Sequence, residues 1–279
     1  MKRAARKEPS EQDEEEVEFY GCKTWIPNWV PQWVRFVACL SYFMVLVVLT
    51  LLVSVFFLPR RRWRVRLVKN FMYFFAPGVF FLYGLRIRVT GGHNRGSLAE
   101  HRPVVYLVNH SSTLDFVTCS RCLSTGTIAI AKKALLLHPI GWIAWLNGTV
   151  FIDRSNRAKA IRSMNSIAGL LRAHGISVCV FPEGTRSRDG RLQPFKKGAM
   201  HLAMQSKVPI VPVVINGAHN IWGKLGWTIK CNEAPIEMKF LPPIETAHWT
   251  ADTLQQHTDE LHALFVQHLR PESRPLKTE

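Results

Sequence analysis

A run of 23 residues without a charged side chain, Phe36–Leu58, constrains the fold of this 279-residue chain more than any other feature. Folded as a helix, the run is about 34 Å long at ~1.5 Å per residue, which is enough to cross the hydrocarbon core of a bilayer. It begins too far into the chain, and is too long, to be a cleavable secretory signal. We therefore expect a membrane-embedded helix that stays in the mature protein.

Basic residues follow this run at once, and six of them lie between Arg60 and Lys69, interleaved with apolar side chains. This composition is typical of a segment that lies on anionic headgroups, and its positive charge places the following part of the chain on the cytoplasmic face. A second apolar run, residues 70–85, is too short to cross a bilayer and contains Pro77 and Gly78, which we expect to break a helix. A single span and a hairpin within one leaflet both fit this pattern.

The charged residues divide the chain into three parts. Residues 1–30 contain a basic cluster, three consecutive glutamates and few apolar residues, which predicts a disordered charged tail. Residues 31–84 are expected to form a membrane-embedded or interfacial helical region, and residues 85–279 a single catalytic domain. The net charge of +16 lies outside the first 35 residues. Such a field attracts nucleic acid, an anionic membrane or a phosphate-bearing substrate.

The sequence after residue 85 alternates between short apolar runs and amphipathic stretches, which is typical of an α/β fold. Hydrophobic residues make up 47% of the chain and charged residues 20%, so a packed core is expected and a disordered or fibrous protein is excluded. The six cysteines have no regular spacing and are interpreted as reduced thiols. The expected strands are 85–89, 104–108, 128–130, 150–152, 177–181, 210–215 and 236–240, and the expected helices are 113–123, 156–174, 197–206 and 251–269.

One of these strands runs into a polar turn, residues 109–115 (NHSSTLD), just before an expected helix. His110 then lies at the carboxyl end of the strand, the edge at which open α/β sheets bind ligands. Asp115 follows five residues later, so the turn can bring its carboxylate to one imidazole N–H and leave the other nitrogen basic. A second interpretation is structural, because Ser112 and Asp115 also have the spacing of a helix capping box.

Another strand ends in a glycine-containing polar turn, residues 181–188 (FPEGTRSR). Gly184 allows close backbone approach, and Arg186 can bind an oxyanion through two N–H groups. We interpret the turn as a phosphate-binding site, although it lacks the Gly-x4-Gly-Lys-Ser/Thr pattern of nucleotide-binding loops. The alternative is a surface turn with solvated arginines, which suits Arg188 better than it suits Glu183 just beyond a buried strand.

Four blocks occur in order along the chain: residues 109–115 (NHSSTLD), 148–154 (GTVFIDR), 181–187 (FPEGTRS) and 208–212 (VPIVP). With them the chain resembles the 1-acylglycerol-3-phosphate acyltransferases of the glycerophospholipid acyltransferase family, over about residues 85–220. The resemblance implies a mixed central sheet flanked by helices, with His110 as general base and Asp115 as its orienting partner. The residues that it places at the site of the phosphate-bearing acceptor are Asn109, Arg154, Glu183, Gly184, Thr185 and Arg186.

By the same resemblance, a fatty acyl group passes from acyl-coenzyme A or acyl carrier protein, as co-substrate, to the sn-2 hydroxyl of lysophosphatidic acid, giving phosphatidic acid. No metal or bound cofactor is expected, because a thioester is already activated. The expected partners are a phospholipid membrane and the two substrates, with no nucleic acid. The catalytic domain is expected on the cytoplasmic face of a bacterial inner membrane or of the endoplasmic reticulum. Alternatives are another lysophospholipid or glycerol-3-phosphate as acceptor and, more remotely, a membrane-bound thioesterase or hydrolase.

Overall fold

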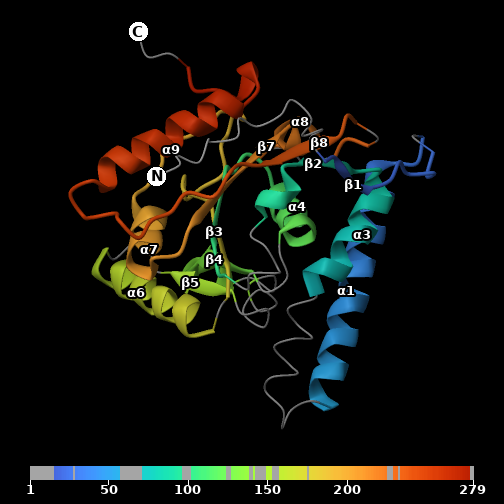
Figure 1. Ribbon diagram of the computed structural model, residues 1–279. Helices are drawn as coiled ribbons and strands as arrows, with labels where there is room; N and C mark the ends of the chain where they lie inside the picture. The colour runs from blue at the N-terminus through green and yellow to red at the C-terminus, as the bar shows by residue number, and fades with distance from the viewer. Residues whose placement is uncertain are drawn as a thin grey trace, which may run out of the picture.

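The structure is a computed structural model that describes residues 16–27, 29–56, 71–95, 102–123, 127–137, 141, 149–152, 157–174, 176–224, 229–231 and 233–276. Within these residues, eight strands form one sheet in the order β1-β2-β8-β7-β3-β6-β4-β5 (Figure 1). Their bounds are β1 (Glu18–Gly21), β2 (Arg86–Thr90), β3 (Val105–Val108), β4 (Ile128–Lys132), β5 (Val150–Ile152), β6 (Val178–Val180), β7 (Ile210–Asn216) and β8 (Ile236–Phe240). The β1–β2 and β7–β8 pairs are antiparallel, and the other pairs are parallel. The predicted mixed α/β fold is confirmed, and each predicted strand is present with ends that differ by at most two residues.

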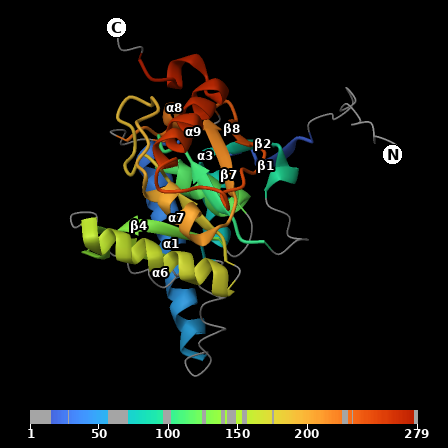
Figure 2. The ribbon, with the colours of Figure 1, turned by 60° about the vertical axis from the view of Figure 1, so that its left-hand side comes forward.

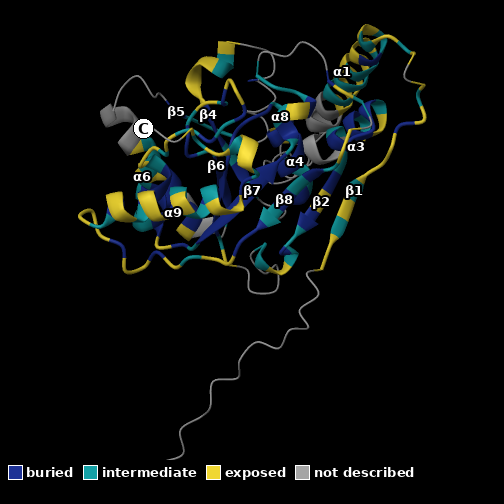
Figure 3. Ribbon diagram, turned by 90° about the horizontal axis from the view of Figure 1, so that it is seen from above, coloured by how far each residue is buried: buried dark blue, intermediate teal, exposed yellow. Residues whose placement is uncertain are grey.

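Helices cover both faces of this sheet. On one face lie α3 (Phe71–Tyr83) and α4 (Leu114–Cys122), and on the other lie α6 (Arg157–His174), α7 (Gly198–Ser206) and α9 (Leu254–His268) (Figure 1). The central strand β3 is buried along its whole length. Its side chains alternate between the two cores, so that Tyr106 packs on the α3 and α4 side and Leu107 on the α6, α7 and α9 side. Figure 3 shows the buried strands between helices whose outer faces are exposed.

Short helical turns complete the chain within the described residues: η1 (Gly92–Asn94), η2 (Lys133–Leu137), α8 (Ala218–Ile221) and η3 (Pro271–Ser273). The predicted helices over 113–123, 156–174, 197–206 and 251–269 correspond to α4, α6, α7 and α9. Their positions follow from apolar residues at helical spacing, as in α9, where Leu254, Leu261 and Phe265 face the core.

The long apolar run forms α1 (Gln32–Phe56), which extends away from the sheet (Figures 1 and 2). Among the described residues, one helix is long and apolar enough to cross a membrane, over Gln32–Leu49, and only 6% of that window is buried. One side of α1 packs against α3, where the ring of Tyr42 stacks on Phe75 with 6.0 Å between the centroids. Its other side leaves Leu40, Met44 and Val48 exposed.

The expected break of the second apolar run at Pro77 and Gly78 is wrong, because α3 continues through both residues. Glycine at position 78 lets α3 pack closely on α1, since a Cβ atom there would lie 2.1 Å from a ring atom of Tyr42. The close approach of α1 to α3 therefore requires glycine at this position. Packing on both α1 and α4 outweighs the cost of about 3 kcal/mol that an interior proline imposes on a helix.

The expected disordered tail over residues 1–30 is wrong for Glu18–Gly21, which form the edge strand β1. This strand pairs with β2, with Glu18 opposite Val89. Arg95 binds the Glu18 carboxylate at 3.1 Å. Four residues are too few to show a hydrophobic period, so the sequence alone did not predict this strand, which is stabilised by its pairing with β2 and by Tyr20 packing on the core.

Strand β1 precedes α1 and strand β2 follows α3, yet the two strands are neighbours in one sheet. The chain therefore leaves the sheet, forms the apolar helices α1 and α3, and returns to the strand next to the one it left. The start of α1 and the end of α3 therefore lie at the same end of the helix pair, next to the sheet, as Figure 1 shows for the upper ends of α1 and α3.

Arg35 joins the apolar helices to the sheet domain. Its side chain is 1% exposed, and its guanidinium donates to the carbonyl oxygens of Leu82 at 2.6 Å, Pro27 at 2.8 Å and Ile26 at 3.0 Å. The positive charge lies beside the last turn of α3, where the unpaired carbonyl groups and the helix dipole are both negative. One side chain thus connects the start of α1, the end of α3 and the loop before α1.

We expect Arg35→Ala to lower the free energy of unfolding by about 3 kcal/mol, because it leaves three carbonyl groups without a charged donor in a buried place. Chemical denaturation of the purified protein in detergent measures this value. Arg88→Ala, which removes an exposed arginine from β2, is the matched control and should change it by less than about 0.5 kcal/mol. Equal effects of the two substitutions would contradict the role given to Arg35.

Candidate active site

Two polar turns meet at the carboxyl ends of neighbouring parallel strands. β3 and β6 pair with Leu107 opposite Val180, so the residues that follow them, 109–113 and 181–187, lie side by side. β3 lies between β6 and β7, and the chain crosses from one of these neighbours to the other through α7. Ligand sites of open α/β sheets form at such a crossover point.

The side chains of His110 and Asp115 meet in this place. His110 Nδ1 lies 2.9 Å from Asp115 Oδ2. The same oxygen accepts hydrogen bonds from the backbone N–H groups of Ser111 and Ser112, at 2.8 Å each. Since this carboxylate oxygen accepts from both N–H groups, it also accepts from the imidazole, so Nδ1 carries the ring hydrogen and Nε2 is the nitrogen left to accept a proton. Asp115 is fully buried and His110 is 9% exposed, so the imidazole lies between the core and the surface.

Two phenylalanines hold the imidazole ring of His110. Phe181 stacks on it with 3.9 Å between centroids and an interplanar angle of 18°. Phe116 meets it edge-on at 6.1 Å. The ring plane is thus set by packing as well as by the hydrogen bond to Asp115, which is the preorganisation that a general base requires.

The capping interpretation of Asp115 is confirmed in part, although the N-cap residue of α4 is Thr113, which makes no side-chain cap bond. Its carboxylate binds the N–H groups ahead of α4, and Ser112 Oγ accepts a hydrogen bond from Leu114 N at 3.0 Å. The two interpretations are compatible because a single oxygen of Asp115 serves both the helix terminus and the imidazole. The hydrogen bonds that start α4 are therefore the ones that aim the carboxylate at His110.

The residues implied as acceptor contacts separate into two groups. Asn109 and Glu183 are buried. The Asn109 amide pairs with the backbone of Ile215 in β7, accepting from its N–H at 2.7 Å and donating to its carbonyl at 2.9 Å. Glu183 Oε1 accepts from the His110 N–H at 2.9 Å. The structure thus gives these two side chains supporting roles, which differ from the substrate contacts that the resemblance implies.

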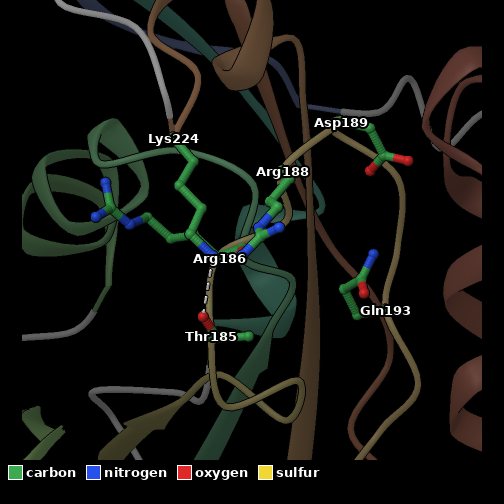
Figure 4. A pocket seen from close by; sticks show the side chains of 6 residues that line it. All are labelled: Thr185, Arg186, Arg188, Asp189, Gln193 and Lys224. Carbon is green, nitrogen blue, oxygen red and sulfur yellow. Dashed lines mark hydrogen bonds between the residues drawn. The ribbon is translucent and has the colours of Figure 1, made fainter.

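The second group lines a pocket of about 500 Å³. Its walls are Thr185, Arg186, Arg188, Asp189, Gln193 and Lys224. Gly184, with φ of +74°, turns the chain between the buried Glu183 and these residues. Figure 4 shows Arg186 and Lys224 on one side, Asp189 and Gln193 on the other, and Arg188 between them. Three cations against one carboxylate make the pocket suited to an anion such as phosphate.

Arg186 connects this pocket to the catalytic turn. Its guanidinium donates a hydrogen bond to the hydroxyl of Thr113, the residue that precedes α4. The N–H of the next residue, Ser187, donates to the His110 carbonyl at 2.9 Å. An anion held by Arg186 would therefore lie beside the turn that carries His110.

Lys224 is a pocket residue that the sequence analysis missed. Its Nζ donates to the Arg186 carbonyl at 2.8 Å and to Thr185 Oγ1 at 3.3 Å. The segment before it is held against the catalytic turn, since Ser112 Oγ donates to the Trp222 carbonyl at 2.6 Å. No local motif marks this lysine, because it reaches the pocket from a separate part of the chain.

Arg154, the remaining implied contact, lies outside the described residues. The strand just before it, β5, stands at the far edge of the sheet, three places from β3. The fourth block becomes part of β7, where Pro212 lies opposite Leu107 of β3. This block is a buried strand beside the central one.

Comparisons with known proteins show the family of this chain. The family model described as Acyltransferase matches residues 86–216. The 1-acyl-sn-glycerol-3-phosphate acyltransferase of Limnanthes douglasii is 36% identical over 239 residues, which cover 85% of this chain and 83% of that protein. The enzyme of the same name from Cocos nucifera is 33% identical over 270 residues, covering 96% and 85%. The human alpha enzyme is 35% identical over 188 residues, covering 67% and 65%.

Among solved structures, the fold is similar to that of the 1-acyl-sn-glycerophosphate (LPA) acyltransferase PlsC from Thermotoga maritima. The TM-score is 0.60 at 21% identity, and the match covers 86% of this chain and 99% of that structure. The similarity in fold, the ordered sequence blocks and the identity to curated relatives all agree. The chain is an acyltransferase and belongs to the 1-acyl-sn-glycerol-3-phosphate acyltransferase family.

Proposed function

We propose that the protein transfers a fatty acyl group from an acyl thioester to the sn-2 hydroxyl of lysophosphatidic acid and so makes phosphatidic acid. The observation that carries this proposal is the pairing of His110 with Asp115 next to a pocket lined by Arg186 and Lys224. A base and an anion site side by side suit an acceptor that carries both a hydroxyl and a phosphate. The names of the relatives support the same acceptor.

In the proposed mechanism His110 Nε2 takes the proton of the sn-2 hydroxyl as its oxygen attacks the thioester carbonyl. A C–O bond forms and the C–S bond breaks, and the imidazolium returns its proton to the leaving thiolate. Asp115 keeps the imidazole in the tautomer that can act as base and stabilises the imidazolium that forms. The remaining contribution is positioning, which can supply about 7–11 kcal/mol of a reaction barrier.

The side chains near His110 argue against a covalent acyl-enzyme, as the hydrolase alternative would need. Ser112 Oγ donates to the Trp222 carbonyl and accepts from Leu114 N, so its hydroxyl is engaged. A hydrogen bond with Cys179, together with burial, raises the pKa of the Cys119 thiol well above its ordinary value. Such a thiol is a poor nucleophile at neutral pH. The acceptor hydroxyl is then the attacking group.

The phosphate of the acceptor is proposed to bind Arg186 and Lys224. A guanidinium can hold two phosphate oxygens at once, and the ammonium of Lys224 adds a second positive charge. A phosphomonoester carries more negative charge than the phosphodiester of most other lysophospholipids, which favours lysophosphatidic acid over those alternatives. Acyl-coenzyme A or acyl carrier protein supplies the thioester, with no metal or bound cofactor.

For the membrane we propose a hairpin that enters and leaves on one face. The shared sheet supports it over a single span, since β1 before α1 and β2 after α3 are hydrogen-bonded to each other. The exposed apolar face of α1 would then lie in lipid. The exposed Trp25, Trp29 and Trp33, at spacings of four just before and at the start of α1, suit the headgroup level. The catalytic domain would lie on the cytoplasmic face, where acyl thioesters are available.

The first prediction concerns the base. His110→Ala should lower kcat for acylation of lysophosphatidic acid by about 10²–10⁴-fold, the usual contribution of a general base. Asp115→Asn should also lose most activity, because its amide no longer fixes the tautomer of His110. Thermal melting in detergent checks that His110→Ala remains folded. Turnover within a few-fold of wild type in a well-folded His110→Ala protein would exclude this role.

The second prediction concerns the acceptor. A panel of lysophosphatidic acid, lysophosphatidylcholine and glycerol-3-phosphate should give the highest kcat/KM with lysophosphatidic acid. Arg186→Ala and Lys224→Ala should each raise the KM for this acceptor by about 10–100-fold, which is the affinity lost when a hydrogen bond between charged groups is removed. The KM for the acyl donor should stay within about twofold.

The matched control is Arg162→Ala, which removes an exposed arginine from α6. Arg186→Lys should restore only part of the loss, because an ammonium cannot bind two oxygens in the plane of a guanidinium. Equal losses toward donor and acceptor would indicate that Arg186 and Lys224 only maintain the turn.

The third prediction concerns topology. In sealed vesicles that contain the protein, a membrane-impermeant maleimide should label Cys22, an exposed cysteine before α1, and Glu272→Cys in η3 from the same side. Peptide mapping by mass spectrometry identifies the labelled residue, and opening the vesicles with detergent gives full labelling as reference. Labelling of the two positions from opposite sides would mean that α1 is a single span.

A further inference from the structure

Glu183 has a place in the site that substrate binding does not explain. It lies in the turn after β6, and the three residues that follow it include Thr185 and Arg186 of the pocket wall. Glu183 itself is 2% exposed and does not line that pocket. A side chain so deeply buried cannot meet a phosphate held by Arg186 without displacing the turn between them.

The contacts of Glu183 instead lead to the backbone of His110. Glu183 Oε1 accepts the His110 N–H at 2.9 Å, and the N–H of Ser187, in the same turn, donates to the His110 carbonyl at 2.9 Å. The turn after β6 therefore forms hydrogen bonds with both the N–H and the carbonyl of His110, and Glu183 accepts the first of them.

Asp115 and Glu183 are two buried carboxyl groups that lie near each other. Asp115 is a fully buried carboxylate with three N–H partners on one oxygen. Glu183 is a second buried carboxyl near it, and within the part of the chain that the structure describes no lysine or arginine forms an ion pair with it. Glu183 Oε2 and Asp115 Oδ1 are both buried without a hydrogen-bond partner among those residues, but Asp115 receives three hydrogen bonds on its other oxygen and Glu183 receives the one from His110 N–H. An unpaired buried carboxylate beside another is costly, and the cost is avoided when one of the two is protonated.

We propose that Glu183 is a positioning residue that acts as a neutral carboxyl group, holding the backbone of His110 while Asp115 alone carries the negative charge beside the imidazole. This inference rests on the proposed role of His110 as the base. A single carboxylate beside the imidazole then orients the ring, while the neutral carboxyl group holds the backbone. Two buried carboxyls in different protonation states thus serve different purposes.

The electrostatics of the cluster agree with this assignment. Burial raises the pKa of Glu183 to about 8, and the negative charge of Asp115 adds to the increase, against the opposing hydrogen bonds from the backbone of His110 and Gln193. Asp115 of α4 is the titratable group whose charge acts on Glu183, whereas His110 and Gln193 act on it through their backbone N–H groups. This direction of the pKa shift favours the protonated form of Glu183 at neutral pH.

The first test compares Glu183→Gln with Glu183→Ala in the full-length protein. Glutamine has the same shape, no charge, and an oxygen that can accept the His110 N–H. Glu183→Gln should keep kcat within about threefold of wild type, whereas Glu183→Ala should lose about 10–100-fold because the base is misplaced. The KM for both substrates should change little in either variant. Equal loss in the two variants, or a higher KM for the acceptor in Glu183→Gln, would overturn the proposal and favour an ionised or substrate-binding Glu183.

The second test does not depend on activity. Glu183 has a higher pKa in the folded protein, about 8, than the value of about 4.3 expected when unfolded. Between these values the unfolded protein binds fewer protons, so rising pH favours unfolding of the wild type through this group. Glu183→Gln lacks the group, and its melting temperature relative to wild type should rise from pH 5 to pH 8.

Glu245→Gln, which changes an exposed glutamate, is the matched control for the loss of one carboxyl group. A melting difference for Glu183→Gln that stays constant between pH 5 and pH 8 would mean that Glu183 is ionised throughout, and the proposal would be wrong. This readout holds even if lysophosphatidic acid proves not to be the acceptor, so failure of the proposed function and failure of this inference give different results.

Discussion

The active site depends on one contact, the clamp that the turn after β6 forms on the backbone of His110. Glu183 binds the N–H of His110 and Ser187 binds its carbonyl. Both bonds exist because β3 and β6 are parallel neighbours with Leu107 opposite Val180, which brings their carboxyl ends together. The same turn carries Arg186, so the spacing between base and anion pocket is set by a few peptide units and not by a flexible linker. Rigid support of this kind gives a catalytic group its precision.

The apolar helices and the catalytic residues share one core. Val79 and Phe80 of α3 belong to the same buried cluster as Leu114 and Val117 of α4, the helix whose first turn holds Asp115. Arg35 binds the Leu82 carbonyl at the end of α3. Strands β1 and β2, which precede and follow the apolar segment, pair with each other in the sheet. The surface proposed to face lipid is therefore connected by packing to the carboxylate that orients the base. An acceptor that resides in a membrane would reach the site with little need for movement between parts of the protein.

Local sequence predicted the elements and the central pair of the site. The strands and helices follow from apolar spacing, and His110 and Asp115 are only five residues apart, so a turn alone can bring them together. Prediction failed where a partner distant in the chain provides the stability. Glu18–Gly21 becomes a strand only beside β2, and Pro77 stays within a helix only because α3 packs on α1 and α4. Lys224 enters the pocket only because its segment binds the turn at Ser112.

The sequence by itself determined the α/β class, the long apolar segment, the pairing of His110 with Asp115 and the basic turn beyond β6, because each depends on residues close together in the chain. Only the tertiary structure decided which side chains of those turns line the pocket and which bind the backbone. Asn109 and Glu183 stand in the same blocks as His110 and Arg186, yet the pairing of β3 with β7 and β6 turns them toward the backbone. The raised pKa of Glu183 has the same origin, since burial and the charge of Asp115 act on it only once the chain has folded around both groups.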